Sequence, residues 1–202
     1  MVDADIITRA IGGDESAQHA LYDAFHAAAF RLAYLLLQNR CDAEEVVQDA
    51  FVYVFRNLKR YDPRRGSFWT WMRVVLVSRS RNKRRRKQFP SVSLDVLAGL
   101  DRVPPDGRTD SSPEGALELH GVQRTVWEAL QQVSAGARDA LILRYYEELP
   151  YAEIGEILGC TADAARARVA HGKTQLRSLL GEPEEERTRQ SSIVRAKKAG
   201  VG

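Results

Sequence analysis

The stretch YAEIGEILGCTADAARARVAHGKTQLRSLL, residues 151–180, determines the fold of the C-terminal half of the chain. Its first eight residues place Ile154, Ile157 and Leu158 on one face of a short helix. Gly159 can adopt the positive φ that ends a helix, and Thr161 is a suitable N-cap for the next one. That next helix, about 162–180, buries an apolar face of Ala165, Val169, Leu176 and Leu180. Two helices joined by a glycine turn indicate a helix-turn-helix, whose second helix enters the major groove of DNA.

The opposite face of this second helix is basic. Arginine is the side chain best suited to guanine edges, and it also binds phosphates. The candidate DNA-binding residues here are Thr161, Arg166, Arg168, His171 and Lys173. A plain helical hairpin with a solvated basic face is the alternative that this motif alone leaves open.

Upstream, helical periodicity covers 119–133 and 137–148, and Pro150 suits the first turn of the 151–158 helix. Residues 88–114 are rich in proline, glycine and serine, a composition typical of a linker. Residues 182–202 are charged and almost without apolar side chains, so we expect a disordered tail.

The N-terminal half also has helical periodicity and no strand alternation. We expect helices over 15–38 and from Asp42 to Leu58, the second capped by Asp42 with Glu45. A third helix starts near Phe68 after a turn over 61–67. The predicted fold is all-α, with an N-terminal helical bundle (1–87) and a C-terminal helix-turn-helix domain (115–181) joined by a flexible linker.

Charge is concentrated in one segment. Between Arg73 and Lys87 lie eight cations and no acid, so a chain of net charge +3 is otherwise at −5. Such a basic stripe attracts a polyanion and releases its counterions. The stripe continues a helix that begins with Phe68, Trp69 and Trp71. Aromatic rings next to cations are typical of single-stranded DNA binding, and the alternative is that Phe68 and Trp71 are core anchors for this helix.

Other classes of protein find little support in the sequence. The four histidines lie on three predicted helices, with His19 and His26 seven residues apart on the first, and none has a catalytic spacing to another reactive side chain, so we expect neither an enzyme nor a bound metal or cofactor. The two cysteines are far apart and form no CxxC pair. The acidic N-terminus and the absence of about 18 consecutive apolar residues favour a cytoplasmic protein without a membrane span.

Three segments together resemble the sigma-70 family of transcription initiation factors, in its compact extracytoplasmic-function (ECF) group. DAEEVVQDAF, residues 42–51, resembles the polymerase-binding helix, and YDPRRGSFWTW, residues 61–71, resembles the following loop and the start of the promoter-melting helix. LILRYYEELPYAEIGEILG, residues 141–159, resembles the C-terminal module. The match covers about 10–87 and 115–180.

The resemblance implies an alternative sigma factor that binds core RNA polymerase and directs promoter recognition, DNA melting and transcription initiation. It assigns polymerase binding to Asp42, Glu45, Gln48 and Asp49. It assigns the minus-ten element and the separating strands to Arg64, Arg65, Gly66, Ser67, Trp69, Arg73, Arg79, Asn82, Lys83, Arg84, Arg85 and Arg86. The loop 64–67 would hold a flipped base, and the basic helix-turn-helix residues would bind the minus-thirty-five element.

The chain departs from the family pattern at several positions. Ser78 stands where the family usually has Asn, and Asn82 where many members have Asp. TADAAR, residues 161–166, replaces a common Ser-x-Gly-Thr-Val-Lys, and Asp163 would repel a nearby phosphate. The promoter sequence therefore does not transfer from the family.

The expected partners are core polymerase and promoter DNA, as duplex and as non-template single strand, with an anti-sigma factor as a candidate third. We expect a monomer when the factor is free. The alternative is a conventional repressor or activator with a C-terminal helix-turn-helix and an N-terminal ligand or dimerisation domain, which leaves the basic stripe and its aromatic neighbours without a role.

Overall fold

The computed structural model describes residues 4–88 and 121–181, and these residues form helices and no strand. In the first range the helices are α1 (Ala4–Ile11), α2 (Glu15–Leu37), α3 (Arg40–Arg56) and α4 (Phe68–Gln88), with short 3-10 turns at Leu58–Arg60 and Pro63–Arg65. In the second range they are α5 (Gly121–Gln132), α6 (Ala135–Tyr145), α7 (Tyr151–Leu158) and α8 (Ala162–Leu180). The all-α prediction is confirmed. Most of the predicted linker (88–114) and the tail (182–202) lie outside the described residues.

In the N-terminal domain, α2 packs against α1, α3 and α4. Its apolar face buries Leu21, Leu32 and Leu36, and these contact the buried face of α3 and α4. By length and hydropathy α2 would be able to cross a membrane. A core helix of a globular domain passes the same test, and α2 contributes six buried residues to this core.

Two local details differ from the sequence-based expectation. Helix α3 starts at Arg40, and its N-cap is Asn39, whose side chain accepts a hydrogen bond from the Asp42 backbone N–H at 2.9 Å. Asp42 was predicted to cap this helix. Its carboxylate instead points toward α4, because Asn39 already satisfies the helix end. Helix α1, with Ala10 in the core, was not predicted.

The C-terminal domain is built from α6, α7 and α8 in close contact, with α5 against α8. The helix-turn-helix prediction holds in detail: Gly159 has a φ of 65°, and the Thr161 hydroxyl accepts from the Ala164 N–H at 3.2 Å. Gly172 on α8 allows close approach to α6, because a Cβ there would lie 2.7 Å from Leu141 Cδ1. Leu180 is 36% exposed, and the prediction that it is buried was wrong because α8 extends beyond its partners.

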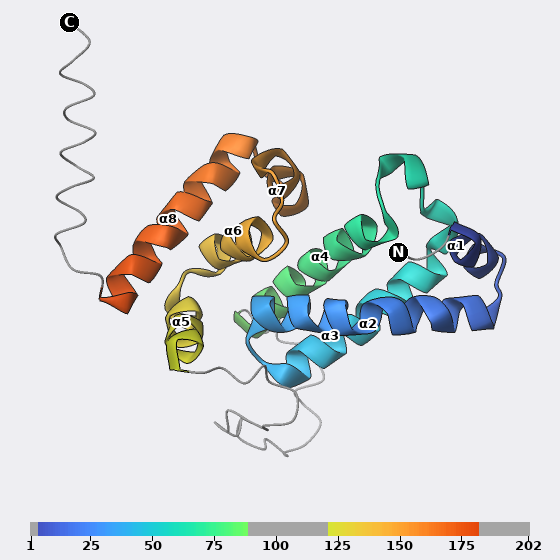
Figure 1. The fold of residues 1–202 in the computed structure, drawn as a ribbon, viewed down its shortest axis with the longest axis horizontal. Helices are drawn as coiled ribbons and strands as arrows, with labels where there is room; N and C mark the ends of the chain where they lie inside the picture. Colours follow the sequence, from blue (N-terminus) through green and yellow to red (C-terminus); the bar gives the residue numbers. More distant parts are fainter. Residues whose placement is uncertain (1–3, 89–120, 182–202) are drawn as a thin grey trace, which may run out of the picture.

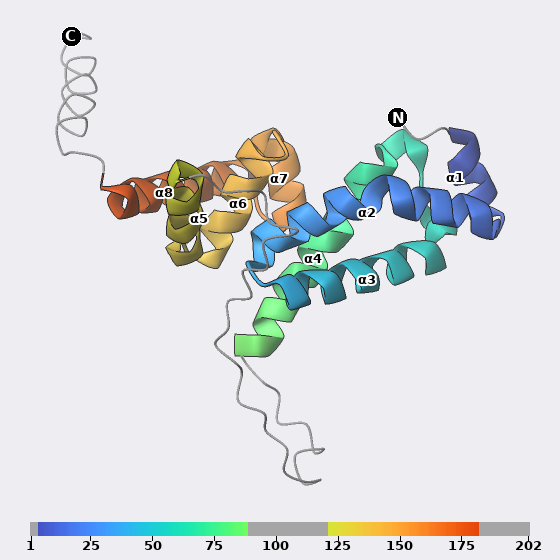
Figure 2. The ribbon, with the colours of Figure 1, turned by 60° about the horizontal axis from the view of Figure 1, so that its bottom comes forward.

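The two domains lie in contact (Figures 1 and 2). Helix α4 contacts α7, and α2 contacts α6. The buried apolar residues of both domains form one connected cluster. The sequence predicted two domains but did not predict this contact.

Candidate nucleic-acid interface

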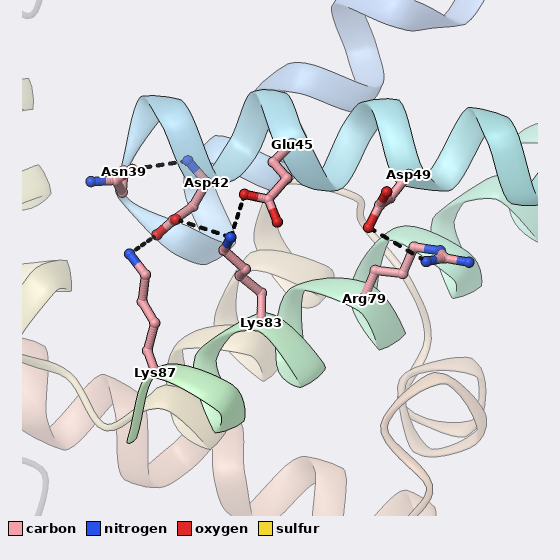
Figure 3. Close-up of polar contacts among 7 residues, drawn as sticks. All are labelled: Asn39, Asp42, Glu45, Asp49, Arg79, Lys83 and Lys87. Carbon is pink, nitrogen blue, oxygen red and sulfur yellow. Dashed lines mark hydrogen bonds and ion pairs between the residues drawn. The ribbon is translucent and has the colours of Figure 1, made fainter. Parts of the chain in front are cut away.

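A row of ion pairs joins α3 to α4 (Figure 3). Lys87 Nζ lies 2.5 Å from Asp42 Oδ2, Lys83 pairs with Glu45 and with Asp42 at 3.7 Å, and Arg79 lies 3.8 Å from Asp49. The three cations follow one another at four-residue steps, so they lie on one face of α4. The acids occupy the facing side of α3.

This row joins two sets of residues that the sequence analysis kept apart. Asp42, Glu45 and Asp49 were predicted to bind polymerase, and Arg79 and Lys83 to bind DNA, yet they neutralise each other. The hydrogen bond with Glu45, with the charge of Asp42 nearby, raises the pKa of Lys83 above its ordinary value. Asp42 is 8% exposed, whereas Gln48 lies on the exposed side of α3. In the sequence, the four-residue spacing of Arg79, Lys83 and Lys87 was the signal from which a common face for these cations could have been predicted.

The remaining cations of the stripe divide according to their helical position. Arg73 is 6% exposed, and the Arg84 side chain is mostly buried against the C-terminal domain. Arg81 donates to the Leu158 carbonyl at 2.9 Å. Arg85 and Arg86 are exposed, and neither forms an ion pair within residues 4–88 and 121–181. Only part of the basic stripe is therefore available to a polyanion in this arrangement.

The loop before α4 lies beside a partly open pocket. Tyr61 donates from its hydroxyl to the Gly66 carbonyl at 3.1 Å, and its burial raises the pKa of the phenol. Gly66 has a φ of 141°, which L side chains rarely adopt, and a Cβ there would lie 3.2 Å from Thr70. The pocket has a volume of about 720 Å³. Its lining is largely apolar and includes Ile7, Phe25, Tyr61, Ser67, Phe68 and Trp69.

The aromatic residues at the start of α4 have different environments. Phe68 is a core residue, 2% exposed. Trp69 is half-buried, stacks on Phe25 with a centroid distance of 6.0 Å, and donates from its indole N–H to Glu147 at 3.0 Å. Trp71 packs on Tyr61 at 5.8 Å. Phe68 is thus a core anchor and Trp69 borders the pocket, while stacking of these rings on single-stranded DNA stays a prediction.

On α8 the predicted reading residues share an open surface. Arg166, His171 and Lys173 are exposed, and Arg168 is partly exposed. Arg166 lies 5.2 Å from the Tyr151 ring, and Lys173 lies 5.9 Å from the Tyr145 ring. Sequence reasoning missed these two tyrosines, which hold the cations over aromatic faces. Because both come from α6 and α7, only tertiary structure brings them to α8.

Family models match most of the described chain. The model for sigma-70 region 2 matches residues 21–89, and the model for sigma-70 region 4 matches residues 123–176. RNA polymerase sigma factor CarQ of Myxococcus xanthus is 31% identical over 84% of this chain and 94% of that protein. ECF RNA polymerase sigma factor SigE of Mycolicibacterium smegmatis is 32% identical over 75% of this chain, which spans 56% of that protein.

Solved structures share the fold. CnrH in complex with the cytosolic domain of CnrY matches with a TM-score of 0.59 at 20% identity, over 87% of this chain and 95% of that one. The sigma factor RpoE in complex with the anti-sigma factor NepR, from Bartonella quintana, also matches with a TM-score of 0.59. The identity is 21%, over 81% of this chain and 96% of that one.

Proposed function

The chain belongs to the ECF group of the sigma-70 family, and from that premise we propose how its residues divide the work of an alternative sigma factor. Such a factor binds core RNA polymerase and promoter DNA and directs promoter recognition and transcription initiation; it is not an enzyme, and it acts with polymerase in the bacterial cytoplasm. The residues that carry each step in this chain are our proposal.

We propose that the exposed side of α3, centred on Gln48, docks on core polymerase. Glu45 and Asp49 border this surface, with side chains 58% and 61% exposed. Asp42 has a different role, because it is buried against two lysines and supports the orientation of α3 on α4. Gln48 carries no charge and pairs with no residue on α4, so its substitution tests docking without disturbing the ion-pair row.

Promoter melting is assigned to the loop 64–67, the pocket beside it and the exposed end of α4. A pocket of about 720 Å³ bordered by Trp69 and Phe68 has room for an extruded base, whose unstacking costs a few kcal/mol. Arg85 and Arg86 would then follow the phosphates. The observation that carries this assignment is that α4 borders the pocket with Phe68 and Trp69 of its first turn and carries the exposed Arg85 and Arg86 near its other end.

Recognition of the minus-thirty-five element is assigned to α8. Its exposed Arg166 and Lys173 lie over tyrosine rings, which restrict them to the surface that would face the duplex. Asp163, exposed in the first turn, disfavours a phosphate there. We further propose that the free factor is a monomer and that an anti-sigma factor is one of its partners, since RpoE was solved with the anti-sigma factor NepR.

Run-off transcription with core polymerase on fragmented genomic DNA tests the proposal. The wild-type factor should initiate at discrete sites. Q48A should lower polymerase affinity, whereas R85A/R86A should weaken promoter binding by holoenzyme at unchanged polymerase affinity. E128Q is the matched control, because Glu128 is exposed and pairs only with Arg124 of its own helix in the described structure. Absence of initiation at every site would contradict the proposal.

A further inference from the structure

Two carboxylates of the C-terminal domain form ion pairs with arginines of the N-terminal domain. The first is Asp139 on α6, which is 1% exposed. Arg84 on α4 donates to both of its oxygens, from Nη1 at 2.8 Å and from Nη2 at 2.5 Å. Arg84 Nη1 also donates to the Leu36 carbonyl at 2.8 Å. A bidentate, charge-assisted pair of this kind uses the same fork of donors with which arginine binds a phosphate.

The second carboxylate is Glu147, just after α6, with a side chain only 8% exposed. It accepts from the Trp69 indole N–H at 3.0 Å and lies 3.4 Å from Arg73 Nε. The Nε and Nη1 atoms of Arg73 are buried and have no hydrogen-bond partner. Glu147 is therefore the counter-ion of a buried cation that is otherwise poorly satisfied.

The neighbours of Asp139 make the first contact sensitive to its charge. Arg138 is partly buried, and burial together with the nearby Arg84 lowers the pKa of its guanidinium. Arg84 pairs with Asp139, whereas Arg138 of the other domain lies near both charges and donates to Gln38 and to the Val133 carbonyl. If Asp139 loses its charge, Arg84 and Arg138 face each other in a desolvated interface without a counter-ion, which favours separation.

We propose that Asp139 and Glu147 are internal competitors of promoter DNA, so that the closed arrangement is autoinhibited. The inference rests on the proposed DNA roles of Trp69, Arg73 and Arg84. None of the three can bind DNA while its donors face the C-terminal domain, and Trp69 borders the pocket assigned to the flipped base. Opening exposes all three, so DNA binding and the closed arrangement are mutually exclusive. DNA therefore shifts the equilibrium toward the open form, and the closed contacts lower the apparent affinity for DNA.

The domain arrangement is tested first, on the full chain without polymerase. Spin labels on Cys41, at the start of α3, and on S178C of α8, in a C160S background, report the distance between domains. The wild-type protein should give one narrow distance distribution. D139N/E147Q should add a broad population at longer distance. E147Q alone, outside any helix, provides a second variant should Asp139 be needed for folding, and E128Q should leave the distribution unchanged.

DNA binding is tested on the same proteins with a fluorescein-labelled, mixed-sequence 20-nucleotide single-stranded DNA. Apparent affinity scales with the fraction of open molecules, so a shift from about one tenth open to mostly open tightens binding about tenfold. D139N/E147Q should show this gain, and E147Q a smaller one. A mere loss of stability would instead weaken binding and lower the thermal midpoint without lengthening the distance.

The outcomes separate this inference from the proposed function. An unchanged distance distribution in both variants, or a broad one in the wild-type protein, overturns the closed arrangement while R85A/R86A still tests promoter binding. A longer distance without tighter DNA binding overturns the competition and the DNA roles of the three covered residues. Longer distance together with tighter binding supports both.

Discussion

Residues of one chemical type in the α4 stripe have different roles because the helix turns each to a different side. Lys83 and Lys87 face the acids of α3, and Arg84 faces Asp139 of the other domain. Arg85 and Arg86 face solvent. Cations already paired with carboxylates bring no net charge to a polyanion. The number of counterions released on DNA binding therefore depends on the exposed arginines more than on the total charge of the stripe.

The exposed arginines give a prediction on salt dependence. R85A/R86A should reduce the slope of log affinity against log salt for promoter binding by about 2, since each phosphate contact contributes about 0.9. Filter binding of holoenzyme between low and moderate salt measures the slope. R124A, on an exposed residue of α5, should leave it unchanged. An equal slope for R85A/R86A and the wild-type protein would show that these arginines do not contact DNA.

Asp42 and Gln48 give a second prediction at this scale, since they share a helix but not an environment. D42A should lower the free energy of unfolding by about 1 kcal/mol, because it removes the partner of two lysines that are partly exposed. Q48A should leave stability within about 0.5 kcal/mol and weaken polymerase binding. Urea denaturation and polymerase pull-down separate the two effects. Equal stability of both variants would contradict the structural role of Asp42.

At the scale of the element, the helix-turn-helix depends on a close approach between the backbone of α7 and the turn that follows it, which only glycine permits. A Cβ on Gly155 of α7 would lie 2.6 Å from the Cys160 carbonyl oxygen, within the turn that leads into α8. Backbone atoms cannot move aside as a side chain can. The angle between α7 and α8, and so the presentation of the reading residues, depends on this contact.

The prediction for this element compares two helical glycines. G155A should destabilise the chain by about 2 kcal/mol through overpacking. G136A, where a Cβ on α6 meets no atom within 4 Å, should be neutral or stabilise by about 0.5 kcal/mol, because alanine favours helix. Thermal and urea unfolding measure both variants. A G155A protein as stable as G136A would mean that the turn relaxes freely.

At the scale of the whole molecule, the contact between domains combines stacking with polar pairs. Tyr34 of α2 stacks on Trp127 of α5 at 5.0 Å, and Arg31 donates to the Tyr146 hydroxyl at 3.3 Å. The exposed large apolar residues in the described ranges are single residues, such as Tyr22, Val74 and Val126 on three helices, or adjacent pairs, such as Tyr145 with Tyr146 and Leu179 with Leu180. A stable dimer buries a continuous apolar surface, which is larger than such single residues and adjacent pairs provide by themselves.

We therefore expect the free factor to be a monomer. Sedimentation equilibrium should give a mass near 22.7 kDa across the micromolar range. Addition of core polymerase should move the chain into the polymerase peak. A concentration-dependent mass approaching twice this value would contradict the expectation and would fit a dimeric regulator instead.

Local patterns in the sequence predicted α2, α7 and α8 to within a residue and the α7–α8 turn in detail, because period, N-cap and C-cap are short-range properties. The N-cap of α3 was misplaced because Asn39 and Asp42 are both good capping residues, and only the helix start distinguishes them. Helix α1 was missed because eight residues carry little periodic signal and its stability comes from packing on α2.

By itself the sequence determined the helical class, the two domains and the family, since periodicity and motif residues are properties of neighbouring positions. Tertiary structure alone decided which acids meet the basic stripe, since Asp42 on α3, Asp139 and Glu147 are 41 to 74 positions along the chain from their ion-pair partners. Opposite charges pair according to distance in space and not in sequence. For that reason the pairing of Arg84 and Arg73 with the C-terminal domain, on which the closed arrangement depends, could not be read from the chain.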